Sequence, residues 1–179
     1  MFKNIDYSII LPTLNEAGHI KNLISEISNI FILRELNFEI IVIDDNSTDG
    51  TIEIIKDIST KNNKLSFYVR ENKKKSLVQS LIYGVKIAKY KRIIWMDADF
   101  SHPPKYIDEF IELNNNYDYD ALVFSRFLKN SERYYSKQNV KAKTIDNLSF
   151  ILNKICRIII SNSLTDYSSG FICIKSDVV

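Results

Sequence analysis

Short apolar segments alternate with amphipathic segments along most of this chain. Six short apolar runs predict buried strands, at 8–11, 39–43, 65–69, 92–96, 121–124 and 171–174. Apolar residues at every third or fourth position predict helices over 15–31, from 47–50 through 58, and over 77–88, 103–113 and 145–160. Strands that alternate with helices favour right-handed crossovers and a mostly parallel sheet. We therefore predict an α/β fold, Rossmann-like, with helices on both faces of the sheet.

Length and composition predict one soluble globular domain spanning residues 1–179. Hydrophobic residues make up 45% of the chain and charged residues 26%, and the net charge of +2 gives no reason to expect a nucleic-acid partner. Cys156 and Cys173 form no disulfide framework, so a reduced, cytoplasmic location is expected. No signal peptide or membrane-spanning stretch is recognisable. The abrupt stop at Val178-Val179 suggests a fragment of something longer.

Acidic side chains follow two of the predicted strands. Asp97 and Asp99 end the strand at 92–96, and Asp44-Asp45 end the strand at 39–43. Ligands of parallel sheets bind outside the carboxyl ends of the strands. Carboxylates there suit Mg²⁺ or Mn²⁺, which in turn bridge phosphate oxygens. A solvated acidic turn at Asp97 and Asp99, and a helix-entry turn at Asp44-Asp45, are the simpler alternatives.

Glycine-rich phosphate loops are missing from this sequence. The chain has four glycines and neither the Gly-x-Gly-x-x-Gly pattern nor a P-loop. Phosphates are therefore expected to be held by a metal ion and basic side chains. Arg126, directly after the fifth strand, could bind a diphosphate bidentately or simply pair with a nearby aspartate. Asp166, before the last strand, either belongs to a turn containing Gly170 or borders the acceptor.

Five motifs in order resemble family 2 glycosyltransferases of the GT-A fold. They are Pro12-Thr13-Leu14-Asn15-Glu16, Val42 to Thr51, Met96-Asp97-Ala98-Asp99 with His102-Pro103-Pro104, Ser125-Arg126-Phe127, and Asp166 to Phe171. The chain is most similar to the dolichol-phosphate mannosyltransferase-like, or polyprenyl-phosphate glycosyltransferase, branch. The resemblance covers essentially the whole chain. It implies a nucleotide-binding part at about 1–125 and an acceptor-side part at about 126–179.

The resemblance also implies roles for particular residues. The nucleotide pocket would be lined by Pro12, Leu14, Glu16, Ile43 and Asp45. Asp97, Ala98 and Asp99 would form the donor and metal site, with Asp97, Asp99, Arg126 and Asp166 as the catalytic set. Arg126 and Arg133 would contact the donor diphosphate or an acceptor phosphate. The implied donor is a GDP- or UDP-sugar, used with Mg²⁺ or Mn²⁺ and with inversion at the anomeric carbon.

Two positions depart from the pattern of this branch. Ser101 stands where glutamine usually precedes His-Pro-Pro, and its hydroxyl is the expected third metal ligand or holds a metal-bound water. Ser76 stands where the third helix usually opens with Lys-Gly-Leu, and its side chain could change the donor preference.

The acceptor is expected to be a polyprenyl phosphate at a membrane surface. A phosphate is already an anion and needs no strong base, whereas a hydroxyl acceptor, such as a polysaccharide, would need one, with Asp166 as first candidate. A helix over 145–160 and an excess of cations between Arg126 and Arg157 could touch anionic headgroups, placing the protein peripherally at the cytoplasmic membrane face, although such a helix could equally pack inward. A catalytically silent nucleotide-sugar-binding domain remains an alternative. A phosphoacceptor receiver domain does not fit, because its second acidic site would follow the third strand, which ends at Arg70-Glu71.

Overall fold

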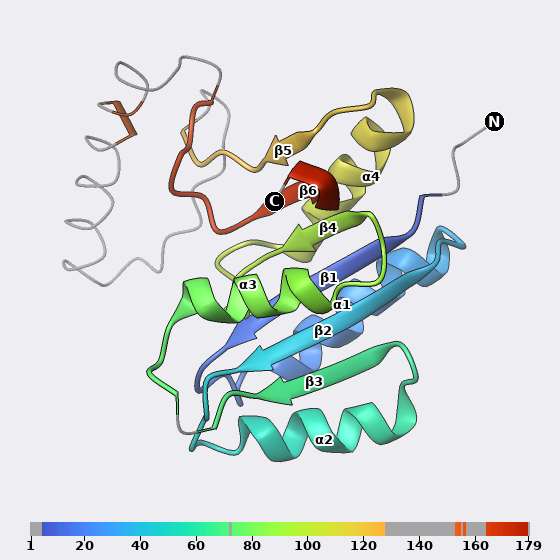
Figure 1. Ribbon diagram of the computed structural model, residues 1–179. Helices are drawn as coiled ribbons and strands as arrows, with labels where there is room; N and C mark the ends of the chain where they lie inside the picture. The colour runs from blue at the N-terminus through green and yellow to red at the C-terminus, as the bar shows by residue number, and fades with distance from the viewer. Residues whose placement is uncertain (1–4, 72, 128–152, 155, 157–163, 179) are drawn as a thin grey trace. The chain divides into compact units, whose positions relative to one another are not determined.

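A six-stranded sheet forms the centre of the protein (Figure 1). The computed structural model describes residues 5–71, 73–127, 153–154, 156 and 164–178. Its strands are β1 (Tyr7–Thr13), β2 (Phe38–Asp44), β3 (Leu65–Val69), β4 (Arg92–Trp95), β5 (Ala121–Val123) and β6 (Ile172–Lys175), in the order β3-β2-β1-β4-β6-β5. The pairs β1–β2, β1–β4 and β2–β3 are parallel, and β4–β6 is antiparallel. The predicted mostly parallel sheet is therefore confirmed.

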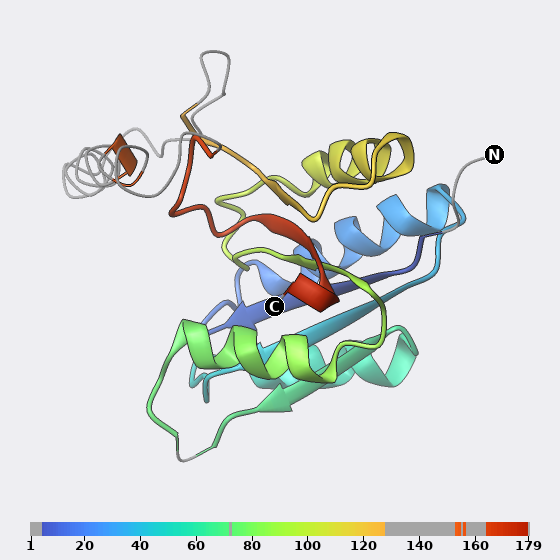
Figure 2. The same cartoon turned by 45° about the horizontal axis from the view of Figure 1, so that its top comes forward.

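Helices cover both faces of this sheet (Figures 1 and 2). They are α1 (Ile20–Leu33), α2 (Thr51–Lys61), α3 (Leu77–Ile87) and α4 (Ile107–Asn116), with short 3₁₀ turns at Pro104–Tyr106 and Ser176–Val178. The connections from β1 to β2 and from β2 to β3 run in one direction along the sheet, and the connection from β3 to β4 returns. Right-handed crossovers therefore place α1 and α2 on one face and α3 on the other. None of the helices within the described residues has the length and apolar character needed to span a membrane.

The chain divides into two compact units. One comprises Met1–Leu122 with Phe171–Val179 and contains the four helices. The other comprises Val123–Gly170.

The core beneath α3 shows why the sheet lies close to this helix. Ile10, Ile41, Ile43 and Ile93 are buried there and pack against apolar side chains of α3. Gly84 of α3 lies directly over β1, because a Cβ built at this glycine would be 2.5 Å from Cγ2 of Ile10. Such a contact is too short for any larger residue without a shift of the helix.

Two helix and strand boundaries near the N-terminus differ from the sequence prediction. The first strand was expected to end at Pro12, but β1 continues to Thr13. The carbonyl of Ile10 accepts a hydrogen bond from the Met96 amide on the β4 side, and the carbonyl of Thr13 accepts one from the Asp45 amide on the β2 side. Because successive residues of a strand face alternate sides, the nitrogen of Pro12 faces the β4 side. The pairing of β1 with β4 has already ended there, at Ile10. The missing N–H of proline therefore costs β1 no ladder hydrogen bond.

The first helix was expected to begin at 15–16, but it begins at Ile20. The backbone amides of Asn15, Glu16 and Ala17 donate instead to side chains of the loop that follows β2 and of the first residue of α2. This tertiary pairing, which local sequence does not reveal, delays the helix.

The proline pair also acts differently from the prediction. Pro103-Pro104 leads into a 3₁₀ turn, and the α-helix itself begins at Ile107 and extends to Asn116, beyond the expected end at 113. The predicted helix over 145–160 falls almost wholly outside the described residues, as does the loop expected at 129–139.

Candidate functional site

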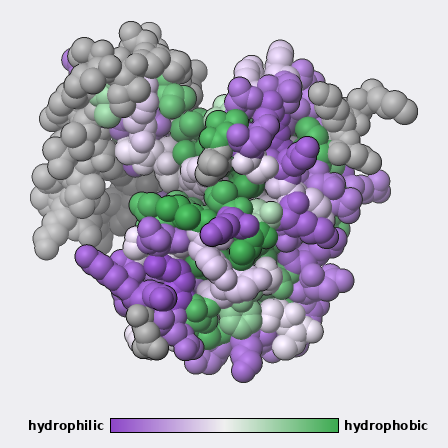
Figure 3. Space-filling view, viewed as in Figure 1, coloured by the Kyte–Doolittle hydropathy of each residue, from purple (hydrophilic) through white to green (hydrophobic). Residues whose placement is uncertain are grey.

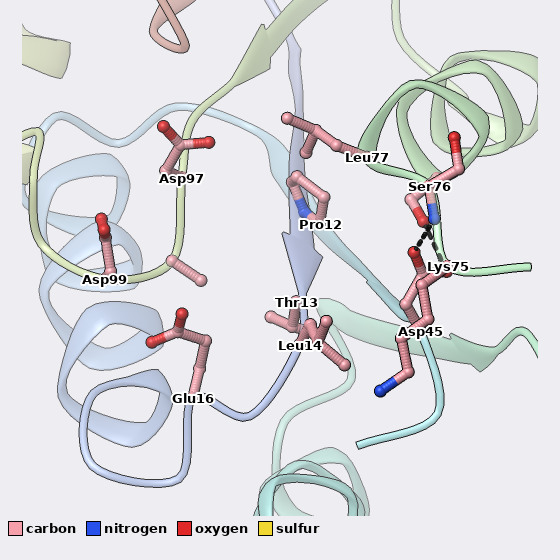
Figure 4. A pocket seen from close by; sticks show the side chains of 12 residues that line it. Pro12, Thr13, Leu14, Glu16, Asp45, Lys75, Ser76, Leu77, Asp97 and Asp99 are labelled. Carbon is pink, nitrogen blue, oxygen red and sulfur yellow. Dashed lines mark hydrogen bonds between the residues drawn. The ribbon is translucent and has the colours of Figure 1, made fainter. Parts of the chain in front are cut away.

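A pocket of about 380 Å³ opens at the carboxyl ends of β1, β2 and β4 (Figure 4). It is lined by Pro12, Thr13, Leu14, Glu16, Asp45, Lys75, Ser76, Leu77, Ser80, Asp97, Ala98 and Asp99. Figure 4 shows Glu16, Asp97 and Asp99 on one side, and Asp45, Lys75 and Ser76 on the opposite side. The residues of β1 and the loop after it lie between the two sides. The pocket therefore has an acidic wall and a mixed polar wall.

The acidic wall concentrates negative charge. Partial burial raises the pKa of the Glu16 carboxyl, and the charges of Asp99 and Asp97 raise it further. The turn that carries Asp99 is sharp, because Phe100 has a φ of 59° and the backbone amide of Ser101 donates to Asp99 at 2.9 Å. Within the described residues, neither Glu16 nor Asp99 forms an ion pair with a lysine or arginine. Such a cluster attracts a cation.

His102 lies behind this wall. Its Nε2 is 3.8 Å from Oδ2 of Asp97, and the residue is 4% exposed. The ring packs against Phe171, with centroids 5.5 Å apart. The imidazole therefore helps to fix the position of the acidic loop.

The opposite wall is organised by Asp45. Its Oδ1 forms an ion pair with Arg70 and accepts from the Ser80 hydroxyl at 3.0 Å, and its Oδ2 accepts from the Ser76 amide at 2.6 Å. Ser76 is also the N-cap of α3, where its hydroxyl accepts from the amide of Gln79. The carboxylate of Asp45 thus attaches β2 to β3 and to the first turn of α3.

Asp44 has a different, internal role. It is fully buried and accepts hydrogen bonds from the Thr13 hydroxyl at 3.0 Å and from the amide and hydroxyl of Ser47 at 2.7 and 2.6 Å. The helix-entry interpretation of this acidic pair therefore holds for Asp44, whereas Asp45 faces the pocket.

Hydrogen bonds from three consecutive backbone amides hold Glu16 at the pocket. Its amide donates to the Thr51 hydroxyl at 2.8 Å, and the neighbouring Ala17 amide donates to Asp49 at 3.0 Å. The Asn15 amide donates to Ser47 at 2.8 Å. The Thr51 hydroxyl and backbone amides hold the pKa of Asp49 below its usual value. The loops after β1 and β2 consequently form one rigid support.

The residues present suit a divalent cation that is shared with a ligand. Mg²⁺ is commonly held by one or two carboxylates together with substrate phosphates rather than by a complete protein cage. Within the described part of the chain, no group of three or more histidine, cysteine, aspartate or glutamate side chains could hold a metal ion on its own. Asp97 and Asp99 would hold the ion, and phosphate oxygens would supply further ligands.

The structure brings together seven of the residues that the sequence predicted for the donor site: Pro12, Leu14, Glu16, Asp45, Asp97, Ala98 and Asp99. Ile43 is fully buried in the core beneath α3 and does not line the pocket, because it lies within β2 while Asp45 lies past its end. Ser101 is exposed and also outside the pocket lining, and its role as a metal ligand remains a prediction. Arg133 lies outside the described residues.

Sequence reasoning missed several pocket residues. Thr13, Leu77 and Ser80 line the pocket, and Arg70 braces Asp45 from behind. The position of Arg70 directly after β3 was the available signal, because it matches that of Asp45 after β2.

Arg126, which is partly exposed, forms an ion pair with the buried Asp166 within the second unit. Arg126 Nε and Nη2 donate to the two carboxylate oxygens at 2.8 and 3.1 Å, and Nη2 also donates to the Ser168 hydroxyl at 2.8 Å. Asp166 is 1% exposed. Burial alone would raise the pKa of Asp166, but the hydrogen bonds and charge of Arg126 outweigh it and hold this pKa below its usual value. The expected alternative, a pairing of Arg126 with a nearby aspartate, is therefore what the structure contains.

The fold, with its pocket at the carboxyl ends of the strands, is of GT-A type, and comparison with known proteins gives the family. The family model for glycosyl transferase family 2 matches residues 8–179. This chain belongs to glycosyltransferase family 2, as the five sequence motifs predicted.

Two curated relatives carry the same name. The chain is 33% identical over 172 residues to the dolichol-phosphate mannosyltransferase of Pyrococcus furiosus, which covers 96% of this chain and 47% of the relative. It is 31% identical over 104 residues to the dolichol-phosphate mannosyltransferase of Mycosarcoma maydis, which covers 56% of this chain and 35% of the relative. The chain thus spans less than half the length of each of these relatives.

Solved structures agree with the fold assignment. Glucosyl-3-phosphoglycerate synthase of M. tuberculosis matches with a TM-score of 0.70 at 17% identity, over 97% of this chain and 59% of that one. S. aureus TarS in complex with UDP-GlcNAc matches with a TM-score of 0.66 at 19% identity, over 97% of this chain and 46% of that one. At these identities the likeness shows the GT-A fold alone.

Proposed function

We propose that this chain is a metal-dependent glycosyltransferase domain that transfers a sugar, with inversion, from a nucleoside-diphosphate sugar to a polyprenyl phosphate. The observation that carries the proposal is the two-walled pocket at the carboxyl ends of the strands. One wall offers clustered carboxylates for a cation and a diphosphate, and the other offers hydrogen-bonding groups around Asp45 for a nucleoside.

The polar wall is suited to a nucleobase or ribose. A carboxylate has about four lone-pair positions, and protein donors use three at Asp45. The fixed carboxylate retains acceptor capacity toward the pocket. Lys75 and the apolar side chains of Pro12 and Leu14 line the same cavity. A flat, polar-edged ring system suits this mixture of groups.

The acidic wall would hold the cation that stabilises the negative charge of the leaving group. As the glycosidic bond breaks, negative charge grows on the departing nucleoside diphosphate. A divalent cation supplies Lewis-acid stabilisation of that charge when it is bound. Asp97 and Asp99 would position the cation, Glu16 would add negative charge to the site, and His102 would keep Asp97 in place.

Asp166 is poorly suited to be the base that a hydroxyl acceptor would need. A general base at neutral pH works best with a pKa near that pH. Asp166 has a lowered pKa and is already bound to Arg126, so it is a poor proton acceptor. A phosphate acceptor is ionised and requires no base.

The names of the curated relatives support the same acceptor class. Both are dolichol-phosphate mannosyltransferases, so a mannosyl donor is the first to test and a polyprenyl phosphate the first acceptor. GDP-mannose supplies the mannosyl group on one of the two nucleotides that the sequence resemblance implies. A structural neighbour from M. tuberculosis, with a TM-score of 0.66, is described in complex with Mn²⁺ and UDP. We therefore include Mn²⁺ and UDP-sugars in the same test.

The test is a transfer assay with radiolabelled GDP-mannose and UDP-sugars, with and without Mn²⁺, using a short-chain polyprenyl phosphate as acceptor. We expect a metal-dependent, organic-extractable glycosyl phosphate product. Transfer to a sugar hydroxyl but not to the lipid phosphate would overturn the acceptor assignment. Nucleotide binding without any turnover would instead indicate a catalytically silent binding domain.

A further inference from the structure

The loop before α3 and the outer side of that helix carry an exposed surface, most of which lies outside the donor pocket. We name it the α3 patch and define it by Lys73, Lys74, Lys75, Leu77, Val78 and Ile82. All six residues are exposed, with 53% of Leu77, 61% of Val78 and 52% of Ile82 accessible. Figure 3 shows hydrophobic side chains over α3 beside a hydrophilic area over the loop that precedes it.

Charge and hydrophobicity coincide in this patch. Three consecutive lysines stand against one acidic neighbour, Glu71. Exposed apolar side chains next to such a run are costly in water, yet they suit the boundary between lipid headgroups and acyl chains. Each lysine near an anionic membrane surface adds about 1 kcal/mol to the free energy of binding.

A groove beside the patch has the same character. It has a volume of about 650 Å³ and is lined by residues of β3, of the loop after it and of α3, which include Lys73 and Lys86. Tyr68 and Tyr83 form an edge-to-face pair there, with centroids 5.6 Å apart, and both are about 40% exposed. Tyrosine is favoured where an apolar surface meets a wet one, as at the headgroup level of a bilayer.

The position of the patch agrees with this use. Lys75 and Leu77 belong both to the patch and to the lining of the donor pocket. The patch and the pocket mouth therefore lie at the same edge of the sheet. A bilayer in contact with the patch would therefore lie beside the mouth of the donor pocket.

We propose that the α3 patch docks this chain onto an anionic lipid bilayer. The biological role of this docking rests on the proposed function. Its test does not, because binding to vesicles requires neither donor nor acceptor. Lysines supply attraction to anionic headgroups, and Leu77, Val78 and Ile82 enter the headgroup region.

The experiment is cosedimentation of the 179-residue chain with vesicles that contain no polyprenyl phosphate. Vesicles of equal parts phosphatidylglycerol and phosphatidylcholine are compared with pure phosphatidylcholine vesicles. Salt of about 0.1 M is compared with about 1 M, which shortens the Debye length from about 10 Å to about 3 Å. We expect binding to the anionic vesicles alone and its loss at high salt.

The decisive variant is Lys73→Glu/Lys74→Glu, because neither residue lines the donor pocket. The matched control is Lys21→Glu/Lys56→Glu, which makes the same change in net charge on exposed positions of α1 and α2, across the sheet from α3. We expect the patch variant to lower vesicle partitioning at least about tenfold and the control at most about twofold. Val78→Ser should weaken binding to the anionic vesicles severalfold at about 0.1 M salt.

Several results would overturn the proposal. Equal losses in the two charge variants would mean that net charge, not the patch, drives binding. Equal binding to neutral vesicles, or no binding to anionic ones, would remove the membrane as partner. A dimer that the Lys73→Glu/Lys74→Glu variant dissociates, without vesicle binding, would assign the patch to a second copy of this chain. Transfer to a short-chain acceptor in solution reports on the proposed function separately.

Discussion

Both walls of the donor pocket carry an aspartate, but within the described residues the charge of one is compensated by neighbouring groups and the charge of the other is not. Asp45 is 6% exposed and is compensated by Arg70, Ser76 and Ser80. Asp99 is exposed and accepts a hydrogen bond from the Ser101 amide, and its charge raises the pKa of Glu16 across a short gap. Asp45 directly follows β2, and Asp99 lies four residues after the end of β4.

The difference teaches that position at a strand end does not fix what a carboxylate does. The partners contributed by the neighbouring strand decide it. The arginine that follows β3 converts Asp45 into a structural anchor that still faces the ligand. The acidic wall keeps its charge, and this charge is what a bound cation would neutralise.

Removal of Asp45 should give the largest effect on stability. Asp45→Ala leaves the guanidinium of Arg70, whose side chain is 14% exposed, without its carboxylate, and breaking a buried pair costs about 4 kcal/mol. The matched control is Asp108→Ala, whose pair with Arg34 is largely solvated and should cost less than about 1 kcal/mol. Urea unfolding measures both. Equal losses would show that Asp45 is no more of an anchor than a surface aspartate.

Removal of charge from the acidic wall should affect activity instead of stability. Asp99→Asn is expected to lower transfer about 100-fold, since the cation at the diphosphate would lose a ligand, while the unfolding midpoint stays near that of the wild type. Asp57→Asn, on exposed α2, serves as the control for a lost surface carboxylate. A transfer rate for Asp99→Asn within twofold of that control would contradict the role of the acidic wall.

The cap of α3 tests how far the polar wall depends on Ser76. Ser76→Ala removes the hydroxyl that accepts from the Gln79 amide and should cost about 1 kcal/mol, whereas Ser76→Gly should cost only a few tenths of that amount. Chemical denaturation of the two variants gives the comparison. The amide of residue 76 is retained in both, so the hydrogen bond to Asp45 should survive. If glycine were the more harmful substitution, backbone freedom rather than capping would control this turn.

The smallest effect should come from Glu16. Its raised pKa means that the folded state disfavours the ionised form, so Glu16 lowers stability once the pH exceeds the ordinary pKa of glutamate. Glu16→Gln should therefore stabilise the protein by at most about 1 kcal/mol at pH 7, with no gain below the ordinary pKa of glutamate. Thermal unfolding across this pH range checks the sign. A stabilisation by Glu16→Gln that grows as the pH falls would contradict the raised pKa of Glu16.

The sequence was informative about the fold because strand and helix periodicities are local. Leu65–Val69 matches the predicted strand, and the pocket gathers the strand-end residues Asp45, Asp97 and Asp99. The sequence was uninformative where tertiary hydrogen bonds override local preference. The amides before α1 serve the loop after β2. Arg70 reaches Asp45, 25 residues away in sequence, and although both residues follow a strand, neither local segment shows that the two side chains pair.

The central claim is that the acidic wall binds a divalent cation together with a nucleoside diphosphate. Calorimetric titration of the chain with GDP and with UDP, each with Mn²⁺ or with EDTA, tests it most directly. We expect binding that requires Mn²⁺ and is lost in Asp99→Asn but retained in Asp57→Asn. Nucleotide binding of equal strength with EDTA, unchanged by Asp99→Asn, would contradict it.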